Sequence, residues 1–400
     1  MKKRLLAAMA AALLLCLPPC GSARAERKAE ARAGARAGIE AAAQPALGEA
    51  DALTGAVLYE PDTGAVLWQN AAEERRAVAG LSKLPAILTL CLMADDGTLD
   101  ESARISVSAA AAGVGGPTAF LEAGEQAAVG DLLKAAVMIS AGDAITALGE
   151  HAFGSQEVFT DNVNGTLQNS GADARTGDPL GAGLTLSPKE LALLGATALD
   201  SGTFRRYCVL YLDTLLHDGG RETELVNANR LVQNYAGCTG LLTGSSAADG
   251  YCGVFSAERN GTRLIAAVTG ADSAVKRTAA AVALLDHGFA GFRTLTLAVA
   301  GEAAGEASVR DGDCKQVALV PHETLRVLLP VSDAAPAPET ELPEKLTAPL
   351  FAAEPVGKLT WRTESGVLAE TLLYPAADVA AFGVTDILRR IAACFAGGGG

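Results

Sequence analysis

The chain has 400 residues, half of them hydrophobic, and a formal net charge of −14 at pH 7. That length is enough for two domains with a sizeable core, and so acidic a chain is a poor match for nucleic acid. We expect no metal or other cofactor, because the cysteine spacings match no zinc pattern and the four histidines do not cluster with the cysteines.

The first 25 residues predict a secretory signal peptide. Three basic residues at positions 2–4 precede an apolar stretch, 5–17, and Ala23-Arg24-Ala25 supplies the small residues that a signal peptidase reads. The alternative, an uncleaved membrane anchor, is disfavoured because the apolar stretch is short for a bilayer. Cleavage after Ala25 removes four basic residues and no acidic one, which changes the formal net charge from −14 to −18. We therefore expect an exported protein, extracellular or periplasmic.

Residues 51–291 predict a first domain, which follows a low-complexity leader at 26–50. Its expected elements are two strands around a turn at 61–64, a mainly helical region at 84–155 that begins with the apolar run 84–93, a capped helix start at Ser187-Pro188, a hairpin over 234–269 and a closing helix at 274–286. In the hairpin we expect one strand at 239–243, a turn through 246–250 and a second strand at 251–268.

A change of pattern near Phe292 predicts a second, all-β domain over residues 292–377. Its expected strands are the short apolar runs 294–299, 316–319, 325–329, 358–362 and 367–373. A Pro- and Glu-rich segment, 333–345, interrupts these runs and predicts a loop. The tail, 378–400, has apolar residues on one helical face between Val384 and Phe395, which predicts an amphipathic helix.

Six cysteines follow the predicted cleavage site. Cys238 and Cys252 flank the expected hairpin, and export permits disulfides, so one prediction is a bridge between them. The alternative is that most of the cysteines are small buried hydrophobic residues.

Three short segments carry a family resemblance. Ala79-Gly80-Leu81-Ser82-Lys83 lies between the expected strand pair and the apolar helix. This order resembles the serine D-alanyl-D-alanine carboxypeptidases, the low-molecular-weight penicillin-binding proteins, which carry Ser-x-x-Lys there. Ser140-Ala141-Gly142-Asp143-Ala144 falls where the family has Ser-x-Asn followed by Asp-Ala, and Leu242-Thr243-Gly244 falls where it has Lys-Thr-Gly. The similarity covers residues 50–376, so it does not rest on one pattern.

The resemblance implies an α/β (α+β) fold of the penicillin-binding, β-lactamase-like type. Such a fold has an antiparallel sheet flanked by helices, a helical lobe and, here, a C-terminal all-β domain. The resemblance also implies a place at the cell wall, with peptidoglycan or its stem peptides as partners. A C-terminal amphipathic helix of this family often lies on the outer face of the membrane. Residues 384–395 are therefore expected either to contact the membrane peripherally or to dock on their own domain.

The family's chemistry assigns a role to each motif. The serine attacks a peptide carbonyl with the lysine as its base, Ser-x-Asn relays protons and holds the substrate amide, and the lysine of Lys-Thr-Gly holds the terminal carboxylate. By resemblance, backbone N–H groups of residues 80 and 245 form the oxyanion hole. The residues that match the family pattern here are Lys83, Ser140, Thr243 and Gly244, and the resemblance adds Ser245 to the expected substrate-binding residues.

Three positions depart from the pattern, one in each motif. Gly80 removes the nucleophile, Gly142 removes the amide and Leu242 removes the cation. Together they predict a protein that no longer performs this reaction and instead binds or scaffolds at the cell wall.

Two enzymatic alternatives remain. One is a working carboxypeptidase with Ser82 as a displaced nucleophile, although adjacent helical residues point about 100° apart, so Ser82 does not share a face with Lys83. The other is a β-lactamase, which would need the same serine at position 80.

Overall fold

The structure is a computed structural model, which describes residues 46–48, 50, 52–343, 345–363 and 366–383. The expected signal peptide, most of the leader and the apolar face at 384–395 lie outside these residues. Across the described residues, no helix has both the length and the apolar character needed to cross a bilayer. The chain divides into two compact units: one runs to Thr294 and includes Leu328–Ser332, and the other contains Leu295–Val327 and the residues from Asp333 onward.

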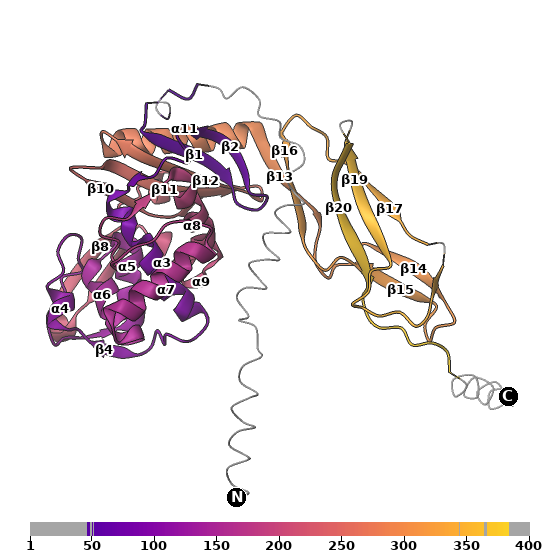
Figure 1. Cartoon of the computed structure of the whole chain (residues 1–400), viewed down its shortest axis with the longest axis horizontal. Helices are drawn as coiled ribbons and strands as arrows, with labels where there is room; N and C mark the ends of the chain where they lie inside the picture. Colours follow the sequence, from indigo (N-terminus) through magenta and orange to yellow (C-terminus); the bar gives the residue numbers. More distant parts are fainter. Residues whose placement is uncertain (1–45, 49, 51, 344, 364–365, 384–400) are drawn as a thin grey trace, which may run out of the picture. The chain divides into compact units, whose positions relative to one another are not determined.

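The first unit is built on an antiparallel sheet with the strand order β10-β11-β12-β1-β2, and β9 also pairs with β11 (Figure 1). The strands are β1 (Gly55–Glu60), β2 (Ala65–Asn70), β9 (Cys238–Gly240), β10 (Thr243–Ser246), β11 (Gly250–Arg259) and β12 (Thr262–Ala271). Alternate residues of β1 enter different cores, since successive strand side chains point to opposite faces. Val57 and Tyr59 belong to one cluster, while Ala56 and Leu58 belong to the other. β10 is an edge strand of this sheet.

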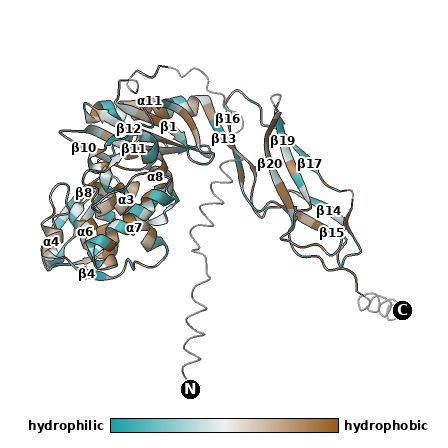
Figure 2. Ribbon diagram, in the orientation of Figure 1, coloured by the Kyte–Doolittle hydropathy of each residue, from teal (hydrophilic) through white to brown (hydrophobic). Residues whose placement is uncertain are grey.

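Helices cover both faces of this sheet (Figure 1). Helix α11 (Ala274–Gly291) packs on one face, where Ala280, Ala281 and Leu284 join the cluster of β1 and β12. α8 (Pro188–Asp200) packs on the other face. The helical lobe continues beyond it with α3 (Leu84–Asp95), α5 (Val129–Ile139), α6 (Gly142–Phe153), α7 (Gln156–Asn169) and α9 (Gly202–Cys208). In Figure 2, α6 and α7 alternate hydrophilic and hydrophobic residues, as helices with one buried face do.

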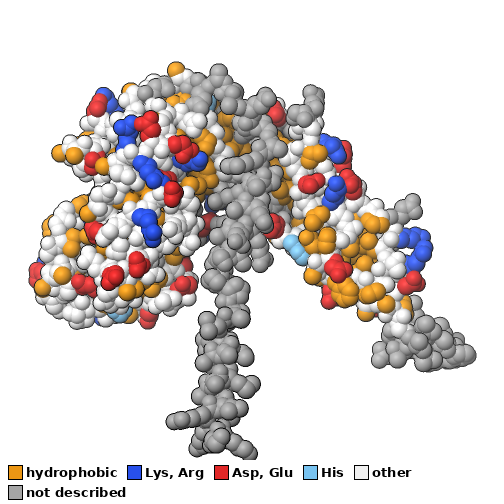
Figure 3. All heavy atoms as spheres, viewed as in Figure 1, with side chains coloured by type: hydrophobic (Ala, Val, Ile, Leu, Met, Phe, Trp, Pro, Cys, Tyr) orange, Lys and Arg blue, Asp and Glu red, His pale blue; other side chains and the backbone are white. Residues whose placement is uncertain are grey.

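Short elements complete the first unit. They are β3 (Arg76–Ala77) with β6 (Thr185–Leu186), β4 (Arg104–Ser106) with β5 (Gln126–Ala128), β7 (Leu212–Leu216) with β8 (Glu222–Val226), and the helical segments η1 (Ala79–Lys83), α4 (Ala109–Ala112), η2 (Asp218–Gly220) and α10 (Leu231–Asn234). Acidic and basic side chains are interspersed over the face shown in Figure 3.

The second unit contains a sheet with the order β17-β19-β20-β15-β14-β18, and a separate pair joins β13 to β16. The strands are β13 (Phe292–Ala298), β14 (Gly305–Arg310), β15 (Gln316–Val320), β16 (Leu325–Pro330), β17 (Pro338–Glu341), β18 (Leu346–Thr347), β19 (Gly357–Thr363) and β20 (Gly366–Pro375). Leu319, Trp361 and Leu373 lie in its core. All five strands expected in this region are therefore present, and its all-β class is confirmed.

Several sequence-based expectations need correction. The strand expected at 251–268 is two strands, because Asn260 and Gly261 both adopt positive φ angles, of 51° and 78°, and turn the chain from β11 to β12. The segment 333–345 is not only a loop, since it contains β17. The sequence reasoning also missed β14, β18 and the β7–β8 hairpin.

The predicted Cys238–Cys252 bridge is wrong. β9 pairs with β11 so that Cys238 lies opposite Ala257, five residues beyond Cys252. All five described cysteines are free, and Cys91, Cys208 and Cys252 are buried. The alternative interpretation, that cysteines serve as small buried residues, holds for these three.

Candidate active site

The segment 79–83 forms a short 3-10 helix, η1, which runs directly into α3. In a 3-10 helix residues i and i+3 are eclipsed, so position 80 and Lys83 face the same side. The backbone of η1 lies against β10: a Cβ added to Gly244 would lie 2.7 Å from the Gly80 nitrogen. Only glycine permits this approach at 244, and the first and third motifs therefore meet in the structure.

Position 80 has room for a side chain. A Cβ added to Gly80 would meet one atom within 4 Å, the Gly244 Cα at 3.4 Å. Because Gly80 carries no functional group, the position eclipsed with Lys83 has no hydroxyl that could attack a carbonyl.

Lys83 is 9% exposed, and its Nζ donates a hydrogen bond of 3.0 Å to the carbonyl oxygen of Ser140. Ser140 ends α5 in the left-handed conformation, with φ 54° and ψ 42°. Burial lowers the pKa of the Lys83 amine below its usual value, and the nearby Asp143 carboxylate opposes that shift. The first and second motifs are thus joined through the lysine amine and a backbone carbonyl.

A side chain at the glycine of the second motif would require its neighbours to move. A Cβ on Gly142 would lie 2.8 Å from Val114 Cγ1 and 3.0 Å from Lys83 Nζ. The Gly142 nitrogen donates to the carbonyl of Pro117 at 2.8 Å. The place of an asparagine side chain is therefore filled by a neighbouring loop and by the lysine itself.

Asp143 fixes this loop to the second motif. Its carboxylate is 1% exposed and accepts hydrogen bonds from the backbone nitrogens of Ala119, Leu121 and Ala144. The sequence reasoning used Asp143 only as part of a family pattern and did not foresee that residues 114–121 would border the site.

The third motif places its residues in different surroundings. Leu242 is 2% exposed and belongs to the large core cluster, so it lies in the core and not on an open wall. Thr243 has a buried hydroxyl without a hydrogen-bond partner among the described residues, and Ser245 is exposed.

Arg277 of α11 is a site residue that the sequence reasoning missed. It is 6% exposed, and its Nη1 makes long hydrogen bonds to the carbonyls of Gly244 at 3.5 Å and Cys252 at 3.4 Å. Its Nε has no partner, and no ion pair to a carboxylate is found for it within the described part of the chain. Burial lowers the pKa of this guanidinium. One signal was available: Arg277 precedes Ala280, Ala281 and Leu284 at helical spacing, which predicts a place on the buried face.

The Ser82 side chain makes its hydrogen bond away from Lys83. Its hydroxyl donates to the carbonyl of Leu180 at 3.1 Å. Gly181 packs so closely on it that an added Cβ would lie 2.3 Å from the Ser82 carbonyl oxygen. Ser82 and Lys83 therefore contact different parts of the unit.

Comparison with known proteins identifies the family. The sequence model described as D-alanyl-D-alanine carboxypeptidase matches residues 40–273. The chain belongs to this family. A second model, for the C-terminal domain of penicillin-binding protein 5, matches residues 292–381 of this carboxypeptidase-family chain. The resemblance inferred from the three motifs is confirmed.

Curated relatives extend over most of this carboxypeptidase-family chain. D-alanyl-D-alanine carboxypeptidase DacF of Bacillus subtilis is 29% identical over 341 residues, which cover 84% of this chain and 88% of the relative. D-alanyl-D-alanine carboxypeptidase DacC of Escherichia coli is 29% identical over 319 residues, covering 76% and 79%.

Solved structures confirm the fold. Penicillin-binding protein 5 from Haemophilus influenzae superposes with a TM-score of 0.71 at 24% identity, covering 86% of this chain and all of that protein. Penicillin-binding protein 6B from Escherichia coli gives a TM-score of 0.67 at 22% identity, covering 84% and 98%. The expected penicillin-binding type of fold is therefore correct for this member of the family.

Proposed function

We propose that this carboxypeptidase-family protein is exported, forms no acyl-enzyme, and binds the D-Ala-D-Ala end of peptidoglycan stem peptides at the cell wall. The observation that carries the noncatalytic part is position 80, which is eclipsed with Lys83 and has no side chain. Loss of the serine nucleophile from a serine hydrolase costs on the order of 10⁶ in turnover.

The surroundings of Lys83 support the same proposal. A base activates a nucleophile when the two groups lie within hydrogen-bond reach. The Lys83 amine instead donates to the Ser140 carbonyl. The competing proposal, Ser82 as a displaced nucleophile, is disfavoured because that hydroxyl donates to Leu180.

The binding part of the proposal rests on β10 and Arg277. The Thr243 hydroxyl and the Arg277 Nε are buried without partners in the described structure, and Arg277 contacts the carbonyl of Gly244, the residue after Thr243. Buried polar groups are ordinarily hydrogen-bonded. A peptide carboxylate accepts from both a hydroxyl and a guanidinium, so a C-terminal carboxylate matches this pair.

Two measurements on the full chain test the proposal. Incubation with a fluorescent penicillin should give no covalent band, and a D-Ala-D-Ala pentapeptide should release no D-alanine. The same pentapeptide should bind, while its C-terminal amide should not. Arg277→Gln should weaken binding about ten- to 150-fold, the range for a charged hydrogen bond of roughly 1.5–3 kcal/mol.

Arg205→Gln, which changes an exposed side chain of α9, is the matched control and should leave binding unchanged. A covalent band that Ser82→Ala abolishes would establish the displaced nucleophile instead. If the acid and amide peptides bound equally well, the proposed recognition of the terminal carboxylate would be wrong.

A further inference from the structure

The backbone between β9 and β10 is strained immediately before Thr243. Two successive residues there have positive φ angles, 105° at Gly240 and 71° at Leu241. Glycine tolerates such an angle, and Gly240 packs so closely on Cys208 that an added Cβ would lie 2.6 Å from the Sγ atom. For a bulky residue such as leucine a positive φ is a strained conformation, which persists only where the surroundings hold it.

The positive φ at Leu241 determines which side chains of this segment face the core. Successive side chains of an extended segment point to opposite faces. Leu241 and Leu242 are neighbours, yet both are buried in the same cluster, with 0% and 2% of their surface exposed. If Leu241 relaxed to an extended conformation, Leu242 would leave the core, and Thr243 after it would turn to the opposite face. The strained conformation therefore orients the third motif.

One side chain holds the strained residue in place. Asn229 is 0% exposed, and its Nδ2 donates to the carbonyl oxygens of Gly240 at 2.9 Å and Leu241 at 3.2 Å. Its Oδ1 accepts from the Leu231 nitrogen at 3.1 Å, which fixes the orientation of the amide. Buried carbonyl groups are ordinarily hydrogen-bonded, so the two oxygens tie this backbone to Asn229.

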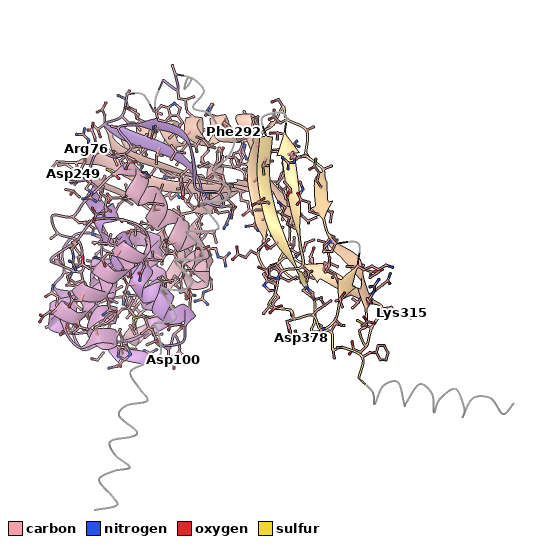
Figure 4. All side chains as sticks on the ribbon, turned by 45° about the vertical axis from the view of Figure 1, so that its right-hand side comes forward. Arg76, Asp100, Asp249, Phe292, Lys315 and Asp378 are labelled. Atoms are coloured by element: carbon pink, nitrogen blue, oxygen red, sulfur yellow. The ribbon has the colours of Figure 1, made fainter. Side chains whose placement is uncertain are left out.

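We propose that Asn229 is a positioning residue for recognition of the peptide carboxylate: it holds Leu241 in the left-handed conformation and so directs the Thr243 hydroxyl to the carboxylate. The inference rests on the proposed function, which places the carboxylate at Thr243 and Arg277. β10 lies at the edge of the first unit, where Figure 4 labels Asp249 in the turn that follows it. Asn229 is completely buried, so it acts through the backbone of residues 240–242.

Fluorescence anisotropy with a labelled pentapeptide ending in D-Ala-D-Ala tests this assignment on the full chain. Asn229→Ala should weaken binding about tenfold, the lower end of the range for loss of a hydrogen bond to a charged group. Thr243→Val removes the hydroxyl, keeps the shape of the side chain and should weaken binding by a similar factor. Because both changes remove the same contact, the double variant should bind within about twofold of Thr243→Val. A residue that only stabilised the unit would give effects that multiply.

Asn227→Ala is the matched control and should change binding by less than about twofold. Asn227 is also buried, at 3% exposed, but its amide donates to the carbonyls of Cys208 and Leu210 and not to the residues before β10. Urea denaturation of each variant measures its stability and confirms that it is folded. If Asn229→Ala does not fold, Asn229→Ser takes its place in the same cycle, because a hydroxyl has one hydrogen and cannot serve both carbonyls.

Three results would overturn the assignment and leave the proposed function standing. They are wild-type affinity in the folded Asn229 variant, equal losses of affinity in the Asn227 and Asn229 variants, and losses that multiply in the double variant. If the wild type does not bind the pentapeptide, the proposed function fails, and the assignment fails with it.

Discussion

Two glycines stand where the family resemblance predicts functional side chains, and their surroundings differ. At Gly80 a Cβ would meet only the Gly244 Cα, at 3.4 Å. At Gly142 a Cβ would lie 2.8 Å from Val114 and 3.0 Å from the Lys83 amine. The first position therefore has space for a side chain, whereas at the second position neighbouring side chains would have to move.

Adding a side chain at position 80 and adding one at position 142 should therefore have different consequences. An empty position can regain its side chain without rearrangement. A refilled position cannot, because protein interiors are close-packed and neighbours would have to move. Gly142 is therefore coupled to Val114 and Lys83, and the loop that carries Val114 is held by the buried Asp143.

The largest expected effect is at the refilled position. Gly142→Ala and Gly142→Asn should each destabilise the protein by about 1–3 kcal/mol, the usual cost of overpacking. Urea denaturation measures the change. The sign is informative, because alanine in a helix is otherwise up to about 1 kcal/mol more favourable than glycine.

Gly80→Ala is the matched control for this cost and should change stability by less than about 0.5 kcal/mol. Val114→Ala removes the closer contact, so the double variant Val114→Ala, Gly142→Ala should lose less stability than the sum of the two single changes. Equal costs for alanine at 80 and at 142 would contradict the comparison.

The structural features that the sequence predicted correctly are those with a signal in neighbouring residues. The turn at 61–64, the buried helix after Lys83 and the start of α8 have nearby signals, and the last is a complete capping box between Ser187 and Glu190. The turn at Asn260-Gly261 also has a local signal, the Asn-Gly pair itself. The apolar residues on both sides made the two strands resemble one continuous strand in the sequence.

The rest of the site depends on contacts between distant residues. Val114 fills the space at Gly142 from 28 positions earlier, and Arg277 reaches the carbonyl of Gly244 from 33 positions later. Leu242 also illustrates this limit. Its place in the motif predicted a position facing a substrate carboxylate, whereas tertiary packing makes it part of the core.

A smaller effect should appear in the pH dependence of stability. Burial lowers the pKa of Lys83 below its ordinary value of 10.5. Between the lowered and ordinary values, the unfolded chain binds more protons than the folded one, so stability rises with pH through that interval. Urea denaturation from pH 7 to 10.5 should show the wild type gaining stability relative to Lys83→Met. A constant difference over this range would show that Lys83 keeps its ordinary pKa, and a falling difference would show that folding raises it; either result contradicts the prediction.

The smallest expected change is Gly80→Ser, which should alter stability by less than about 0.5 kcal/mol because the space is present. The new hydroxyl would face a lysine amine that already donates to the Ser140 carbonyl, and it would lack an asparagine at position 142, where a side chain requires its neighbours to shift. We therefore expect fluorescent penicillin to label Gly80→Ser slowly or not at all.

Adding Gly142→Asn and Leu242→Lys completes the family pattern but overpacks one position and places a cation in the core. The triple variant should therefore be labelled faster than Gly80→Ser, but only the fraction of the protein that folds should be labelled. Rapid labelling of Gly80→Ser alone would show that the space at residue 80 is sufficient for catalysis, and that the refilled position at 142 has no effect on the chemistry.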